Sequence, residues 1–158
     1  MQAAMEIQPP SEEERTMAVL AHVLQLVGWW IAPLVIFVVK RKSRFTSFHA
    51  LQALLLQIVS VIFVILTVVF MVLWFAIVFS SFVLHPPAKD APPPAGFFLL
   101  VPVAWLVFMA YGGGMLVIAI VFGITAGRGE WAEYPLLGRM ARKLLNIGPG
   151  GAVLPSSQ

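Results

Sequence analysis

The three histidines are the residues of this chain best suited to metal binding or acid–base chemistry, and they lie far apart. His22, His49 and His85 form no H-x-x-x-H or H-E-x-x-H pattern, and no acidic partner stands at ligand spacing. The chain contains no cysteine, which excludes thiolate ligands and disulfides. The sequence therefore predicts neither a metal site nor a cofactor.

Catalytic groups are missing as well. Hydrolysis inside a membrane needs a nucleophile beside a base or a pair of aspartates, and Asp90 is the only aspartate. Pumps and coupled transporters place charged side chains inside their helix bundles, whereas the apolar stretches of this chain hold none. We therefore predict that the protein is not an enzyme.

Uncharged polar side chains do occur within the apolar stretches, and they are spaced to meet one another. His22 and Gln25 lie one helical turn apart, as do His49 and Gln52, and Gln57 follows Gln52 at about 140° around a regular helix. Such a cluster either joins packed helices by hydrogen bonds or lines a narrow polar path. The sequence favours packing and leaves pore lining as the alternative.

Three long stretches without Asp, Glu, Lys or Arg must position these residues: 16–39, 45–88 and 91–127. About 20 apolar residues suffice for a helix to cross the hydrocarbon core. The composition, 60% hydrophobic and 11% charged, also exceeds what a soluble core needs. We predict an all-α integral membrane protein with three transmembrane helices, over about 16–39, 50–84 and 96–126, and a lipid bilayer as its surroundings.

The first of these stretches has a start signal and an interruption. Ser11 and Glu14 are spaced as a capping box, which predicts that a helix begins there. Pro33 lacks the amide of a regular helix, so the segment is either one kinked span or a re-entrant pair with its tip near residues 28–33. The kinked span is favoured, and the side of the N-terminus stays open.

The third stretch is rich in glycine. A proline-rich connection, residues 85–94, separates it from the second stretch. Within it, small residues favour close approach of another helix, and a flexible helix is the alternative. The predicted packing residues are Gly112, Gly113, Gly114, Gly123 and Gly127.

An amphipathic helix is predicted over about 135–147. Its apolar face combines Leu136, Leu137, Met140, Ala141, Leu144 and Leu145, and its basic face combines Arg139, Arg142 and Lys143. Such a helix either lies on an anionic membrane surface or packs on the protein's own spans. The predicted organisation is a single membrane domain, 11–147, between disordered tails at 1–10 and 148–158.

Basic residues predict the orientation. Four lie in the first loop and four follow the third span, against Lys89 alone in the proline-rich loop. The positive-inside rule then places the first basic loop and the C-terminus in the cytoplasm. The same clustering beside apolar runs explains the net charge of +3 without nucleic-acid binding.

Several short motifs together resemble a known family. They comprise Leu20-Ala21-His22, Gly28, Pro33 to Ile36, Lys40-Arg41, His49-Ala50, Ala53-Leu54, Gln57, Ala126 to Glu130 and Tyr134-Pro135. Across about residues 15–147 the chain is similar to small bacterial relatives of the twenty-kilodalton channel subunit of the chloroplast inner-envelope protein translocon. The resemblance implies a compact bundle of membrane helices and a link to translocation. Gln52 and Leu55 stand where that family commonly carries an acidic residue and an asparagine.

The predicted function follows from the membrane helices, the absence of catalytic groups and the resemblance. We predict a non-enzymatic inner-membrane protein that serves as an oligomerising or accessory component of a membrane assembly related to translocation. Its partners would be a second copy or another membrane protein. The alternative is a multi-copy channel for small solutes or peptides, built around His49, Gln52 and Gln57.

Overall fold

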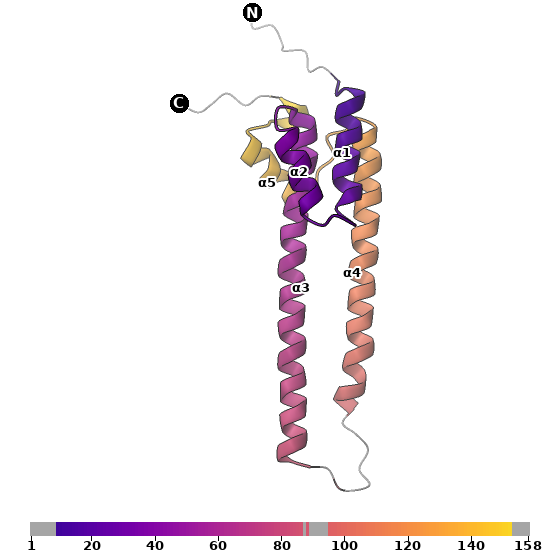
Figure 1. Cartoon of the computed structure of the whole chain (residues 1–158), viewed down its shortest axis with the longest axis vertical. Helices are drawn as coiled ribbons and strands as arrows, with labels where there is room; N and C mark the ends of the chain where they lie inside the picture. Colours follow the sequence, from indigo (N-terminus) through magenta and orange to yellow (C-terminus); the bar gives the residue numbers. More distant parts are fainter. Residues whose placement is uncertain (1–8, 87, 89–94, 153–158) are drawn as a thin grey trace, which may run out of the picture. The chain divides into compact units, whose positions relative to one another are not determined.

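The computed structural model describes residues 9–86, 88 and 95–152, and these residues confirm the all-helical prediction (Figure 1). The chain divides into two compact units, residues 1–59 with 116–158 and residues 60–115, which we call the core unit and the two-helix unit. The helices are α1 Glu12–Leu24, α2 Ile31–Val39, α3 Arg44–Leu84, α4 Ala95–Gly127, α5 Leu137–Leu145 and a short 3-10 helix, η1 Pro149–Gly151.

Two helices are long and apolar enough to cross a membrane: α3 over Arg44–Leu84, and α4 over Phe98–Gly127. The 41 residues of α3 reach about 60 Å, roughly twice the thickness of the hydrocarbon core. Within α4, Pro102 is accommodated inside the helix. The second and third predicted spans thus correspond to two candidate spans, and the described residues contain no third helix of that length and hydropathy.

The first predicted span is two short helices, α1 and α2, which lie beside one another (Figure 1). The break falls between Leu24 and Ile31, where Trp29 adopts a φ of 51°. Pro33 does not cause it, because it sits in the first turn of α2, where no helical N–H bond is lost. The favoured single kinked span is therefore wrong, and the hairpin has the form of the re-entrant alternative.

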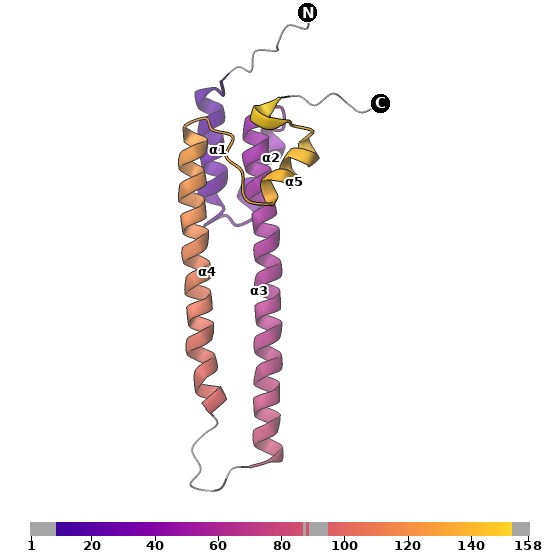
Figure 2. The ribbon, with the colours of Figure 1, turned by 180° about the vertical axis from the view of Figure 1, so that it is seen from behind.

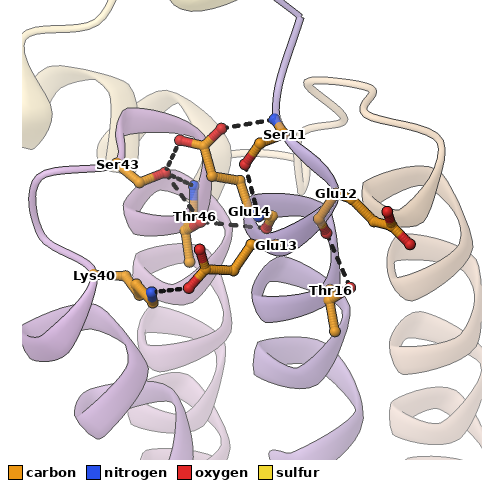
Figure 3. Close-up of polar contacts among 8 residues, drawn as sticks. All are labelled: Ser11, Glu12, Glu13, Glu14, Thr16, Lys40, Ser43 and Thr46. Atoms are coloured by element: carbon orange, nitrogen blue, oxygen red, sulfur yellow. Dashed lines mark hydrogen bonds and ion pairs between the residues drawn. The ribbon is translucent and has the colours of Figure 1, made fainter.

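Polar contacts fasten the start of α1 to the beginning of α3 (Figure 3). The predicted capping box is confirmed: Ser11 and Glu14 exchange backbone-to-side-chain hydrogen bonds of 2.8 and 3.3 Å. The Ser43 hydroxyl donates to the Glu14 carboxylate at 2.6 Å, and Glu13 forms an ion pair with Lys40. Hydrogen bonds from Ser43 and then from Ser11 lower the pKa of Glu14 below its usual value, so this carboxylate stays charged in mildly acidic solution.

Small residues let the helices of the core unit approach closely. Ala18, Ala21, Ala50 and Ala126 are fully buried, and they pack in two clusters that also contain Phe45 and Ile36. Close backbone approach between small residues is the usual basis of helix packing in membranes. A third cluster joins α3 to the C-terminal part of the unit and consists of Phe48, Leu51, Ala141 and Ile147.

The two-helix unit is different in character, because most of its large apolar side chains are exposed. Phe63 stacks on Tyr111 with 5.1 Å between ring centres, and Ser60 donates to the sulfur of Met115 at 3.7 Å. An exposed apolar surface of this extent fits hydrocarbon surroundings.

The C-terminal part of the chain differs in detail from the prediction. The predicted amphipathic helix exists but is shorter, 137–145 in place of 135–147, and η1 falls within residues predicted as the C-terminal tail. Residues 1–8 and 153–158 of the two predicted tails, and most of the proline-rich connection, lie outside the described residues.

Candidate functional site

A chain of buried polar side chains runs through the core unit and joins three segments that are distant in sequence. His22 on α1 contacts the Tyr134 hydroxyl through Nδ1 at 2.8 Å and the His49 Nδ1 through Nε2 at 3.0 Å. His49 Nε2 then meets the backbone carbonyl of Glu130 at 3.1 Å. Both imidazoles are fully buried. Two of the predicted polar residues therefore form the centre of one continuous network.

The backbone carbonyl of Glu130, at one end of the network, determines the direction of every hydrogen bond in it. A carbonyl oxygen only accepts, so His49 carries its proton on Nε2 and donates to Glu130. In the neutral ring, Nδ1 of His49 is then an acceptor, and His22 must donate to it from Nε2. That leaves Nδ1 of His22 as an acceptor for the Tyr134 hydroxyl. The network is fully paired with both histidines neutral and Tyr134 protonated.

Burial supports these protonation states. Desolvation, with a smaller contribution from His49, lowers the pKa of His22 well below its usual value near 6.5. Desolvation also raises the pKa of the Tyr134 phenol above its usual value near 10. At neutral pH the imidazole of His22 therefore accepts and the hydroxyl of Tyr134 donates.

Gln52 extends the network along the same extended segment. Its Nε2 donates to the carbonyl of Ala132 at 3.1 Å, and its Oε1 accepts the N–H of Tyr134 at 2.7 Å. His49 and Gln52 lie one turn apart on α3, so they reach alternate residues of the extended backbone that follows α4. Figure 2 shows this connection running from α4 toward α3 and α5. These two side chains hold it in place.

A glycine permits the closest approach at this point. A Cβ on Gly138 would lie 2.6 Å from the Cβ of Glu133 and 3.0 Å from Oε1 of Gln52. Only a residue without a side chain fits there, because real Cβ atoms essentially never come that near another carbon. Gly138 therefore allows α5 to fold back onto the segment that Gln52 holds.

The other two predicted polar residues form a separate contact. Gln57 donates from Nε2 to the backbone carbonyl of Gln25 at 3.0 Å, and both side chains are buried. Gln25 caps the C-terminal end of α1, so this bond ties the end of α1 to α3. The structure thus gathers all five predicted polar residues in the core unit, and the Gln25 side chain also lies near the Tyr134 hydroxyl. Their packing role stays a prediction.

The three predicted membrane-surface residues are divided between two environments. Arg142 is half-buried: it pairs with Glu133, donates to the carbonyl of Gly148 at 2.7 Å, and lies 5.6 Å from the Phe48 ring centre. These contacts hold its side chain against the core unit. Arg139 and Lys143 are exposed, and for them a surface role stays a prediction.

The predicted packing glycines are also divided. Gly123 faces Val23 and Gly127 faces Val19, so α1 of the same chain occupies this side of α4. A Cβ added at Gly112, Gly113 or Gly114 would meet none of the described atoms within 4 Å. Their role in packing against another helix stays a prediction.

Within the described residues, no group of three or more His, Cys, Asp or Glu side chains could hold a metal ion. His85 follows the last residue of α3, remote in sequence from the histidine pair, and its N–H donates to the carbonyl of Ser81 at 3.0 Å.

Sequence reasoning missed the partners of the polar residues. Tyr134 supplies both a hydroxyl and a backbone N–H to the network, while Glu130 and Ala132 contribute only carbonyl groups. Every residue has a backbone carbonyl, so a sequence does not show which of them accept hydrogen bonds from side chains. The available signal was Tyr134 itself, one of two tyrosines and adjacent to Pro135 outside the apolar stretches.

Comparison with known proteins identifies the family. The model of the magnetosome magnetite crystal formation protein family matches residues 13–141, a range that includes every side chain of the histidine network. None of the curated proteins compared with the chain matches it. The solved structures give no match either.

Proposed function

We propose that this chain, which belongs to the magnetosome magnetite crystal formation protein family, acts in crystal formation as an integral protein of the magnetosome membrane. The family match over residues 13–141 is the observation that carries the proposal. Membership also makes it a non-enzymatic membrane protein. The two candidate spans support its residence in a membrane.

The family match corrects the interpretation drawn from short motifs. The resemblance to the chloroplast translocon subunit is wrong, and so are the translocation-related role and the channel alternative that followed from it. Many of the shared motifs consist of small residues and uncharged polar residues, which are common where membrane helices of any family pack.

The distribution of charge supports a specific orientation. Nine of the ten Lys and Arg residues lie between Arg15 and Arg44 or between Arg128 and Lys143, and Lys89 alone lies between the two candidate spans. The positive-inside rule places the two basic regions in the cytoplasm. In this orientation the connection between α3 and α4 faces the magnetosome lumen, where the crystal grows.

The tip of the α1–α2 hairpin supports contact with the membrane from the cytoplasmic side. Val27 is 90% exposed, and Trp29, Trp30 and Ile31 are also exposed. Tryptophan is enriched at the boundary between headgroups and hydrocarbon, because its ring is amphipathic. The hairpin then dips into the interface without crossing, and α3 and α4 alone span.

The histidine network supports a structural contribution of the core unit. Each hydrogen bond in it joins elements of the chain to one another, and its terminal acceptor is a backbone carbonyl. A rigid unit of this kind suits a protein that organises the magnetosome membrane around the growing crystal.

Deletion of the gene in a magnetite-forming host tests the proposal. We expect electron microscopy to show a changed distribution of crystal lengths, which a wild-type copy restores. The chain should also be recovered with purified magnetosomes. An unchanged distribution in the deletion strain, with wild-type numbers of crystals, would remove this chain from crystal formation.

A further inference from the structure

Helix α5 presents an apolar stripe that nothing in the core unit covers. Leu136, Met140 and Leu144 follow one another at a spacing of four residues and are 71%, 49% and 65% exposed. Met140 and Leu144 lie on one face of α5 at this spacing, and Leu136 directly precedes the helix. The opposite face of α5, with Gly138 and Ala141, is buried against the rest of the core unit.

The backbone at the start of α5 is strained at Leu136, the exposed residue that precedes the helix. Leu136 has φ 69° and ψ −54°, and the N–H of Leu137 bonds to the carbonyl of Pro135 at 2.9 Å. These features define a γ-turn of the rare, strained kind, which is unfavourable for a branched side chain. Hydrogen bonds at Tyr134, from its N–H to Gln52 and from Gly138 to its carbonyl, hold the turn. The fold therefore maintains an exposed leucine at a strained position.

Two basic side chains border the stripe. Arg139 and Lys143 are exposed and lie three and seven residues after Leu136, so they form a row along one edge of the apolar residues. An apolar stripe beside a basic row is the pattern of helices that lie in the interface of an anionic membrane.

The position of α5 along α3 fits a location at the membrane interface. Gly138 lies against Gln52 of α3, and α3 becomes exposed and apolar at Ile58 and Val59. Six helical residues separate Gln52 from Ile58, about 9 Å. The exposed face of α5 is thus within reach of the level at which α3 meets lipid.

We propose that the exposed face of α5 docks on the anionic headgroup surface of the membrane that α3 and α4 span. Leu136, Met140 and Leu144 enter the boundary between headgroups and acyl chains, and Arg139 and Lys143 contact lipid phosphates. Arg142 takes no part, because it is held by Glu133 and Gly148. This inference concerns lipid contact and stands apart from the role in crystal formation.

Spin labels test it directly, because the chain has no cysteine of its own. The full-length Met140→Cys variant is labelled and placed in nanodiscs of phosphatidylcholine alone or with phosphatidylglycerol. Collision with oxygen reports lipid, and collision with a water-soluble nickel complex reports solvent. Leu66→Cys and Glu12→Cys, both at exposed positions, provide the lipid and water references.

We expect the Met140 label to resemble the Leu66 label in phosphatidylglycerol nanodiscs. Combining Arg139→Gln with Lys143→Gln should lower the ratio of docked to free α5 by about 25-fold, since each basic residue near an anionic surface contributes about fivefold. The effect should disappear in phosphatidylcholine.

Three results would overturn the proposal. The label could collide with the nickel complex as Glu12 does in both lipids, which would place α5 in water. It could be shielded from both reagents, which would mean that protein covers the stripe. It could be equally lipid-exposed in both compositions and in the charge variant, which would remove the role of anionic lipid.

Discussion

At the scale of single residues, the structure is organised by neutral polar side chains that lie where an apolar sequence offers no other partner. His22, His49 and Gln52 all bind segments outside their own helix. In a low-dielectric interior an unpaired polar group is costly, which favours these bonds as contacts between helices. The sequence predicts that uncharged polar groups in apolar stretches meet, and the structure brings His22 and His49 together.

Their partners could not be predicted. Glu130 and Ala132 take part through carbonyl groups that every residue possesses, so no side-chain pattern marks them. Gln57 was predicted on the broad face of His49 and Gln52, yet it binds the end of α1 instead. Helical spacing gives the direction of a side chain, but the neighbour it meets depends on the packing of other helices.

Tyr134→Phe tests the network at one atom. The substitution removes the hydroxyl that donates to Nδ1 of His22 and leaves a buried acceptor unpaired, which should cost about 1–3 kcal/mol of stability. We expect a lower melting temperature of the protein in detergent. Tyr111→Phe is the matched control, since Tyr111 stacks on Phe63 through its ring. Equal melting temperatures for the two variants would contradict the directed network.

The lowered pKa of His22 predicts a dependence of stability on pH. Between the folded pKa and the ordinary value near 6.5, the unfolded chain binds a proton that the folded chain does not. Stability should therefore fall as pH is lowered from about 7 to 5, by up to about 1.4 kcal/mol per pH unit for this group. Glu14, with its lowered pKa, contributes a further loss only below about 4.5.

Thermal unfolding in detergent at a series of pH values measures this slope. His22→Gln should flatten the curve between pH 7 and 5 while leaving the loss below pH 4.5. A wild-type melting temperature that is constant from pH 7 to 5 would show that His22 is not buried as the structure has it.

At the scale of elements, the long apolar helices follow from composition and the short ones depend on local detail. The charge-free stretches predicted α3 and α4 because their length and hydropathy allow few alternatives. The separation of α1 from α2 corresponds to the re-entrant alternative and not to the favoured kink, because Pro33 occupies the first turn of α2. The turn lies at residues 25–30, near the predicted tip at 28–33.

The packing of α5 against the core unit depends on Gly138. Gly138→Ala adds a Cβ 2.6 Å from that of Glu133, and such overpacking costs about 1–3 kcal/mol, more than the gain in helix propensity. We expect a lower melting temperature and faster proteolysis after Lys143. Gly113→Ala, where a Cβ meets nothing within 4 Å, should be neutral or stabilising. The same result for both variants would contradict the close approach of α5.

At the scale of the whole molecule, fold class could be predicted and function could not. A chain with 60% hydrophobic residues and long charge-free stretches has few options besides membrane helices. Magnetite formation carries no such signature in the sequence. The function became accessible only through the family match over residues 13–141.

The sidedness of the spans is the property on which the proposed role depends. If the basic regions lie in the cytoplasm, the core unit acts from outside the compartment in which the crystal grows. Only the connection between α3 and α4 then faces the lumen. The opposite orientation would bring the histidine network and α5 to the mineral side.

The most direct measurement is therefore labelling of intact, purified magnetosomes with a membrane-impermeant maleimide. Two single-cysteine variants of the cysteine-free chain are compared, Lys42→Cys before α3 and Ala88→Cys after it. We predict that Lys42→Cys is labelled at once and Ala88→Cys only after detergent is added. Labelling of Ala88→Cys alone in intact magnetosomes, or absence of the chain from the magnetosome fraction, would contradict a cytoplasmic core unit on the magnetosome membrane.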